Sequence, residues 1–203
     1  MGRVKQVHVI HSDQQLAALT SAARQEIVDV LSQMGTVSVA EIAAALGRPA
    51  DALYYHLRAL KRAGLVLQVG VQRRGGRPEG LFRTIAPELQ LRYRPRNQGN
   101  RWAVTAIVGS MLRLGIRDFR SAFRSGHVRV SGPKRELWAL RRTGWLSPAQ
   151  VASVNTLIQR MSRMAAKPKG PGRLYGVTIL LTPLDHRGRK SRSASVSPKE
   201  RLK

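Results

Sequence analysis

The chain has 203 residues, of which 42% are hydrophobic, enough for one sizeable domain and a second small one. Its formal net charge of +25 predicts attraction to a polyanion, either a nucleic acid or an acidic membrane surface. The chain contains no cysteine, no apolar run long enough to cross a bilayer and no signal-peptide pattern. Disulfides, thiolate chemistry and membrane insertion are therefore excluded, and a cytoplasmic protein is expected.

The N-terminal part predicts an arm followed by two helices. Residues 1–12 alternate apolar and polar side chains, as in a short strand or an arm. His8 and His11 have a spacing that can ligate a metal on a helix, but without further clustered ligands they are interpreted as surface residues and no metal is expected. Residues 13–19 and 21–34 follow as helices. Their apolar stripe consists of Leu16, Leu19, Ile27, Val30 and Leu31.

A helix-turn-helix is predicted after a short strand at residues 36–38. Ser38 lies three residues before Glu41, the spacing of a capping box, and starts a helix that runs through Leu46. Residues 47–49, Gly-Arg-Pro, then form a turn, because glycine can adopt positive φ and proline can open a helix but not continue one. Two short helices joined in this way make a helix-turn-helix.

The second of these helices has two distinct faces. On a helical wheel Leu53, Leu57 and Leu60 share one narrow sector and should face a core. The opposite face is long, cationic and aromatic, which favours a helix that reads the DNA major groove, although an amphipathic surface helix shows the same pattern. Residues 50–63 are the predicted recognition helix. The candidate DNA contacts on this helix and its preceding turn are Arg48, Ala50, Asp51, Tyr54, Tyr55, Arg58, Lys61 and Arg62.

A β-hairpin wing is predicted over residues 65–85. The alternating residues 65–71 and 81–85 indicate two strands, the first with one face formed by Leu65, Leu67, Val69 and Val71. Residues 73–80, RRGGRPEG, are expected to form a flexible loop between the strands. Three arginines of this loop are candidate contacts to the DNA backbone or a narrow minor groove: Arg73, Arg74 and Arg77.

The stretch AEIAAALGRPADALYYHLRALKRAGLV resembles the ArsR-type winged-helix transcriptional regulators, and the resemblance covers residues 14–85. It includes the pair His56-Leu57 and the strand entry at residues 63–66, Ala-Gly-Leu-Val. The resemblance implies a DNA-binding regulator that dimerises through helices outside the reading motif. Hydroxyl residues are usual near the start of the family's recognition helix, whereas this chain has Ala50, Asp51 and Ala52, so base preference is not transferred. The family's metal-binding cysteines are absent, and metal control is not expected.

The rest of the chain predicts a basic linker over residues 88–100, a helical region over 101–185 and a disordered basic tail over 186–203. Within the helical region we expect a long helix over residues 101–124, capped by Asn100. A short alternating stretch at 127–130, a helix at 134–141, a helix opened by the capping box at 147–150 and a strand at 174–181 are expected to follow.

This second region has three candidate roles. It is either a packing unit without a ligand, a dimerisation region that uses the long helix, or an effector region whose ligand the sequence does not identify. Trp102, Trp138 and Trp145 could line a small-molecule pocket, but such residues more often belong to a core.

The predicted fold class is mainly α with a small β wing, a winged helix-turn-helix followed by a second helical region with a short sheet. The predicted function is a sequence-specific transcriptional regulator that binds double-stranded DNA as a homodimer. Residues 48–101 carry net charge +9, from twelve basic and three acidic side chains, but the excess charge continues beyond them. An RNA-binding or nucleoprotein-scaffold role therefore stays open, whereas a protein-interaction module is disfavoured by the arginines. No catalytic residue, cofactor or enzymatic activity is expected.

Overall fold

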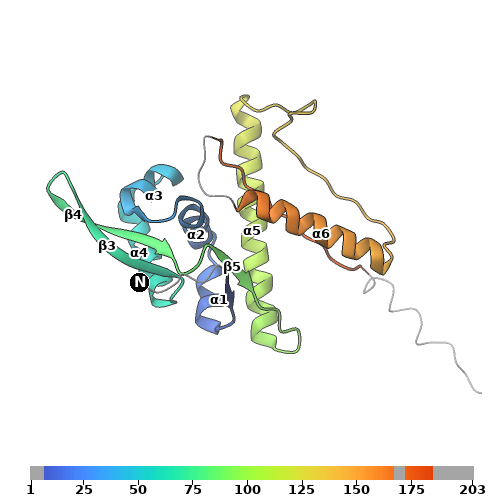
Figure 1. Cartoon of the computed structure of the whole chain (residues 1–203), viewed down its shortest axis with the longest axis horizontal. Helices are drawn as coiled ribbons and strands as arrows, with labels where there is room; N and C mark the ends of the chain where they lie inside the picture. The colour runs from blue at the N-terminus through green and yellow to red at the C-terminus, as the bar shows by residue number, and fades with distance from the viewer. Residues whose placement is uncertain (1–6, 167–171, 185–203) are drawn as a thin grey trace, which may run out of the picture.

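The computed structural model describes residues 7–166 and 172–184, with the side chains of Arg74 and Arg77 left out. Within these residues the chain forms six helices and two small sheets, and the β3–β4 hairpin extends outward on one side of the helices (Figure 1). The helices are α1 (Asp13–Leu19), α2 (Ala22–Met34), α3 (Val39–Leu46), α4 (Ala50–Arg62), α5 (Gln98–Ser125) and α6 (Pro148–Ala165). The strands are β1 (Val7–Ile10), β2 (Val37–Ser38), β3 (Val66–Arg74), β4 (Arg77–Thr84) and β5 (Glu88–Leu91).

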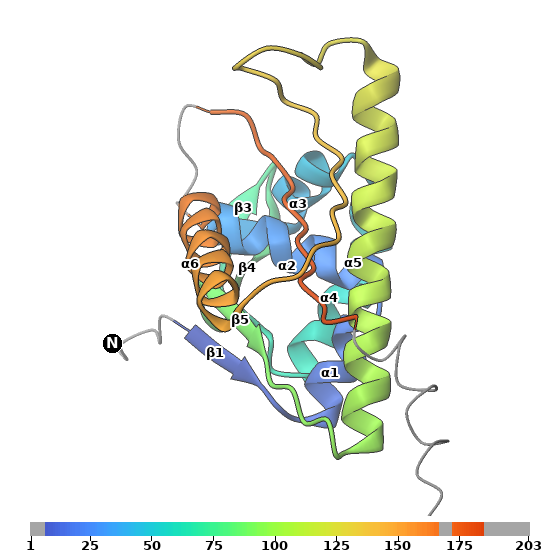
Figure 2. The same ribbon diagram turned by 90° about the vertical axis from the view of Figure 1, so that its right-hand side faces the viewer.

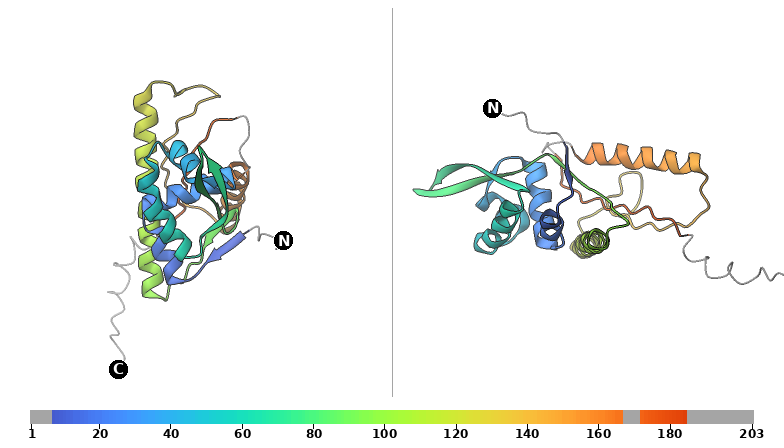
Figure 3. Two further views of the ribbon diagram at one scale, coloured as in Figure 1. Left: turned by 90° about the vertical axis from the view of Figure 1, so that its left-hand side faces the viewer. Right: turned by 90° about the horizontal axis from the view of Figure 1, so that it is seen from below.

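The wing is a three-stranded antiparallel sheet in the order β2-β4-β3, so the predicted short strand before α3 is confirmed. The predicted flexible loop over residues 73–80 is wrong, because β3 and β4 continue until only Gly75 and Gly76 connect them. Both glycines have positive φ, 56° and 79°, as the two central residues of a type I′ turn require. The hairpin projects from the body beside α3 and α4 (Figure 3).

The predicted pattern of one buried face along the first wing strand is also wrong. Leu65 and Val66 are both fully buried, whereas Val69 and Val71 are 44% and 61% exposed. The register of the ladder shifts between Gln68 and Gly70, so Val69 is an extra residue in a β-bulge. The bulge changes the phase of the side chains, and beyond it the hairpin leaves the core.

Residues 88–91, predicted to be part of a linker, form β5 and pair in parallel with β1. Residues 7–10 therefore form a strand, one of the two alternatives expected for the N-terminal arm. Asn100 does not cap the long helix as predicted, because α5 begins at Gln98 and Asn97 is its N-cap. Asn100 is instead 4% exposed, accepts a hydrogen bond from the Arg94 backbone N–H (2.6 Å) and donates one to the Arg92 carbonyl (3.0 Å).

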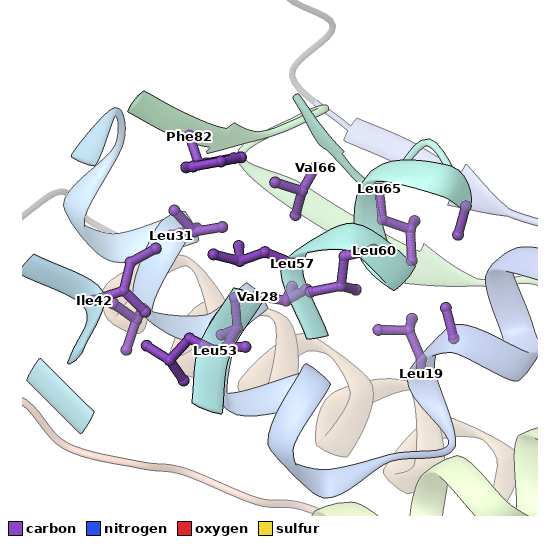
Figure 4. Packing of buried hydrophobic residues seen from close by; sticks show 14 of the residues in the cluster. Leu19, Val28, Leu31, Ile42, Leu53, Leu57, Leu60, Leu65, Val66 and Phe82 are labelled. Carbon is purple, nitrogen blue, oxygen red and sulfur yellow. The ribbon is translucent and has the colours of Figure 1, made fainter. Parts of the chain in front are cut away.

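One hydrophobic core joins α1, α2, α3, α4, the base of the wing and the first half of α5 (Figure 4). The apolar stripe predicted for residues 13–34 is confirmed, since all five of its members are buried. Ala103, Val104 and Ile107 of α5 belong to the same core, although the sequence assigned that helix to a separate region. The first part of α5 therefore supports the helix-turn-helix directly.

Beyond Ser110, none of the described residues is buried. The predicted helix at 134–141 and strand at 174–181 are wrong, since both segments lack regular secondary structure. The capping box at Ser147 and Gln150 is confirmed and starts α6, but α6 has no buried residue. The three tryptophans are at least 64% exposed, so none of them belongs to the core. Trp102 lines an open surface hollow with Gln98, Arg101, Thr105 and Ala106, and neither Trp138 nor Trp145 is among the residues that line it. The tail predicted at 186–203 lies outside the described residues.

Candidate nucleic-acid interface

The turn between α3 and α4 is built as its residues predict. Ser38 Oγ accepts a hydrogen bond from the Glu41 N–H (3.3 Å), and Glu41 Oε2 accepts one from the Ser38 N–H (2.8 Å), which completes the capping box. Gly47 ends α3 in the left-handed conformation, with φ of 61°, and Pro49 is the N-cap of α4. These local signals set the direction in which α4 leaves the turn.

The inner face of α4 confirms the predicted helical wheel. Leu53 and Leu60 are fully buried and Leu57 is 2% exposed. Figure 4 shows the three leucines directed into the core that also contains Leu31 and Ile42. Each buried leucine contributes roughly 1.5–3 kcal/mol to stability, so the rotation of α4 about its own axis is strongly determined.

The outer face of α4 is therefore open to solvent. Tyr55 is 61% exposed and Tyr54 is 44% exposed, and Arg58 is also exposed. Asp51 and Arg62 extend this exposed face toward the two ends of the helix. Tyrosine and arginine are long enough to reach base edges or phosphates in a major groove.

Three of the candidate DNA-contact residues interact with other parts of the protein. Ala50 is half-buried and packs against the core. Arg48 Nη2 lies 2.5 Å from Glu26 Oε2 and forms an ion pair. Lys61 Nζ donates a hydrogen bond to Gln68 Oε1 at 3.0 Å, which links α4 to the wing.

The basic residues of the wing lie close to the two-glycine turn between β3 and β4. Arg73 is exposed on β3, and the backbones of Arg74 and Arg77 pair across the strands next to the two glycines. Glu79 Oε1 accepts a hydrogen bond from the Ala40 N–H in the first turn of α3 (2.7 Å). This contact joins the wing to the helix-turn-helix, and the only sequence signal for it was a single carboxylate in an arginine-rich stretch.

A buried carboxylate that sequence reasoning missed connects the turn to α5. Glu26 of α2 is 8% exposed, and its two oxygens each lie 2.5 Å from an arginine, Arg48 in the turn and Arg117 in α5. Arg117 also binds Asp118, and the hydrogen bond that Arg117 donates to this carboxylate is the main cause that raises the pKa of Arg117. Arg48 and Arg117 are far apart in sequence, so no local pattern predicts this cluster.

The surroundings of His56, which lies beside the exposed face, disfavour its charged form. Burial lowers its pKa, and the positive charges of Arg24 and Arg48 lower it further. Its Nδ1 atom is buried and has no hydrogen-bond partner in the described part of the chain. Because the folded domain disfavours the charged imidazole, the neutral form of His56 favours folding. This contribution to stability is lost as the pH falls below 6.5, the ordinary pKa of histidine.

Replacing Glu26 with glutamine should lower the free energy of unfolding by about 1–3 kcal/mol, because two arginines lose a buried counter-charge. Both arginines keep partly exposed side chains, so solvent screening holds the loss below that of a fully buried pair. Urea denaturation followed by circular dichroism measures the change. The same substitution at exposed Glu88 is the control. Equal losses at both positions would contradict the assigned role of Glu26.

Across residues 7–166 and 172–184, no group of three or more potential metal ligands is found. No helix in those residues is long and apolar enough to span a membrane.

Comparison with known proteins identifies the same domain. A family model described as a helix-turn-helix domain matches residues 19–69, about a quarter of the chain. The match extends from the end of α1 into β3 and includes α2, α3 and α4. No curated protein matches the chain significantly. The chain therefore contains a helix-turn-helix domain of a family that includes ArsR-type regulators, and this domain indicates a DNA-binding regulator.

Proposed function

We propose that this chain is a sequence-specific transcriptional regulator of the ArsR type that binds double-stranded DNA. Helix α4 lies in the major groove and the β3–β4 wing lies along the backbone or in the minor groove. The observation that carries this proposal is the exposed face of α4, where Tyr55 and Arg58 lie opposite three buried leucines and Tyr54 lies on one flank. The core leaves α4 only one face to present, and that face carries the long polar side chains.

On this face each residue type has a defined contact chemistry. The guanidinium of Arg58 matches O6 and N7 of guanine in a bidentate contact. The carboxylate of Asp51 can accept a hydrogen bond from the amino group of cytosine, and its negative charge also favours its place in the first turn of α4. Tyr54 and Tyr55 supply hydroxyl groups for phosphates or bases.

Arg73 should contribute affinity without sequence preference. In the Arg73→Ala variant we expect weaker binding to all duplexes and a salt dependence whose log–log slope falls by about one, because one phosphate contact is lost. Fluorescence anisotropy over a salt series measures both quantities. Arg96→Ala removes the same charge from the connection between β5 and α5, away from the wing (Figure 1). An equal change in slope for the two variants would argue against a wing contact.

We propose a homodimer formed through the outer face of α5. Exposed or half-buried residues recur there at alternating steps of three and four, the spacing of a two-helix seam. These residues are Trp102, Thr105, Gly109, Leu112, Ile116, Phe119 and Phe123. A two-fold dimer would place two copies of α4 on half-sites about one helical turn apart, roughly 34–36 Å.

Selection of bound duplexes from a random DNA pool tests the proposed function directly. We expect the full chain to enrich an inverted repeat, since a two-fold dimer selects a palindrome. A selected pool that is indistinguishable from the starting pool would contradict sequence-specific binding.

Binding to structured RNA is the second candidate, and the connection before α5 favours it. Arg92, Arg94 and Arg96 are exposed there, and Tyr93 is 70% exposed between two of them. Exposed aromatic rings among arginines can stack on unpaired bases. Competition between a duplex DNA and a structured RNA at physiological salt distinguishes the two candidates. A DNA regulator stays bound to the duplex when the RNA is added, whereas an RNA-binding protein releases it.

A further inference from the structure

Residues 127–166 and 172–184 contain the elements of a folded unit, but these described residues lack a core of their own. Helix α6 has a complete capping box, and two extended segments, residues 135–146 and 172–184, lie between α5 and α6 in Figure 2. None of the described residues in this stretch is buried. A segment with this many large apolar side chains and a well-formed helix normally buries one face against a partner.

The two extended segments are already held together at one point. The Tyr175 hydroxyl donates a hydrogen bond to Glu136 Oε1 (2.7 Å), and Arg173 lies 3.5 Å from the same oxygen. The other oxygen, Oε2, accepts a hydrogen bond from the Arg129 N–H (2.9 Å). These contacts lower the pKa of Glu136, first through the backbone hydrogen bond from Arg129 and then through Tyr175. The segments are therefore arranged as neighbours before any partner binds.

The segment from residue 174 to 181 has free hydrogen-bonding capacity. Its sequence, LYGVTILL, has no charged residue, and its backbone N–H groups have no backbone partner among the described residues. It passes α5 at Gly115, where an added Cβ would lie 3.6 Å from Thr178 Oγ1. An uncharged extended segment with unpaired backbone groups is a site for the addition of another strand.

The apolar surface in this stretch is large enough for a stable dimer. Among the described residues from 135 to 184, thirteen large apolar side chains are each at least 38% exposed. They are Trp138, Leu140, Trp145, Leu146, Leu157, Met161, Met164, Leu174, Tyr175, Val177, Ile179, Leu180 and Leu181. If each exposes on the order of 100 Å², the total is about 1,300 Å² per copy, above the roughly 800 Å² that a standard interface buries on each partner.

We infer that residues 127–166 and 172–184 complete their fold with the same residues of a second copy of this chain. The extended segments of the two copies pair as one sheet, and the apolar side of each α6 covers it. A second copy is the favoured occupant because each chain supplies both an unpaired strand edge and an apolar helix face, so a two-fold arrangement satisfies both. The second half of α5 also leaves large apolar side chains exposed, at Ile116, Phe119 and Phe123. This inference deepens the proposed homodimer and does not depend on DNA binding.

The Met161→Glu variant of the full chain tests the inference. Met161 is 47% exposed on the apolar side of α6, so the substitution leaves the winged helix intact but places a charge inside the proposed interface. We expect self-association to weaken on the order of 100-fold, measured by sedimentation equilibrium. Gln159→Glu introduces the same charge on the polar side of α6 and should leave association unchanged.

Amide hydrogen exchange of residues 174–181 distinguishes this interface from a dimer formed through α5 alone. In the parent chain we expect slow exchange at high protein concentration, and fast exchange on dilution and in Met161→Glu. The inference would be overturned if the parent chain is a monomer at tens of micromolar. It would also be overturned if residues 174–181 exchange freely in the dimer, or if the two glutamate variants weaken association equally. Binding of each variant to a DNA half-site is measured separately, so a failure of the DNA proposal remains distinguishable.

Discussion

Replacing Leu57 with alanine should lower the free energy of unfolding by about 2–5 kcal/mol, because the substitution leaves a cavity at the centre of the core. Leu57 is 2% exposed and lies among Leu31, Val66 and Phe82 (Figure 4). Helix α2, helix α4 and strands β3 and β4 therefore lose a shared contact. Urea denaturation followed by circular dichroism gives the change in the free energy of unfolding.

Val71→Ala is the control for that measurement. Val71 is 61% exposed on the wing, so the loss of its methyl groups should change stability by less than about 0.5 kcal/mol. If the two variants unfold at the same urea concentration, Leu57 is not a core residue and the assigned orientation of α4 is wrong.

Replacing Arg58 with alanine should reduce affinity for the selected DNA site by about 10–100-fold and have a much smaller effect on unrelated duplexes. The loss corresponds to one bidentate contact with a base, worth about 1–3 kcal/mol. Because Arg58 is exposed and points away from the three buried leucines, the fold should be unaffected. A repeated selection from the random pool should show relaxed preference at one or two base pairs in each half-site.

Arg58→Lys separates recognition from charge. Lysine keeps the positive charge but not the planar pair of donors, so we expect it to lose sequence preference like alanine while it retains the salt dependence of the parent. Parent-like preference in Arg58→Lys would show that Arg58 acts only through its charge.

The helix-turn-helix could be predicted from the sequence because its determinants are local. The capping box at Ser38 and Glu41, the left-handed Gly47 and the leucine spacing in α4 each involve residues close in the chain. Turn chemistry and helical periodicity specify such elements without knowledge of the rest of the fold. The exposed face of α4 followed from the same periodicity.

The features that sequence reasoning missed depend on contacts between distant residues. The parallel pairing of β1 with β5 joins residues about eighty positions apart, and the ion pairs of Glu26 join α2 to α5. The phase of the wing strand was wrong because a single extra residue, Val69, shifts the ladder. Alternation predicts that a strand exists but does not locate a bulge.

The most direct test of the account replaces purines in the selected duplex with 7-deazapurines, which lack the N7 acceptor in the major groove and leave the minor groove unchanged. If α4 presents Tyr54, Tyr55 and Arg58 to the major groove, one or two such replacements in each half-site will weaken binding of the parent chain by about tenfold or more. At least one of these replacements will leave the affinity of the Arg58→Ala variant unchanged. Parent affinity that is unchanged by every replacement would contradict the placement of α4 in the major groove.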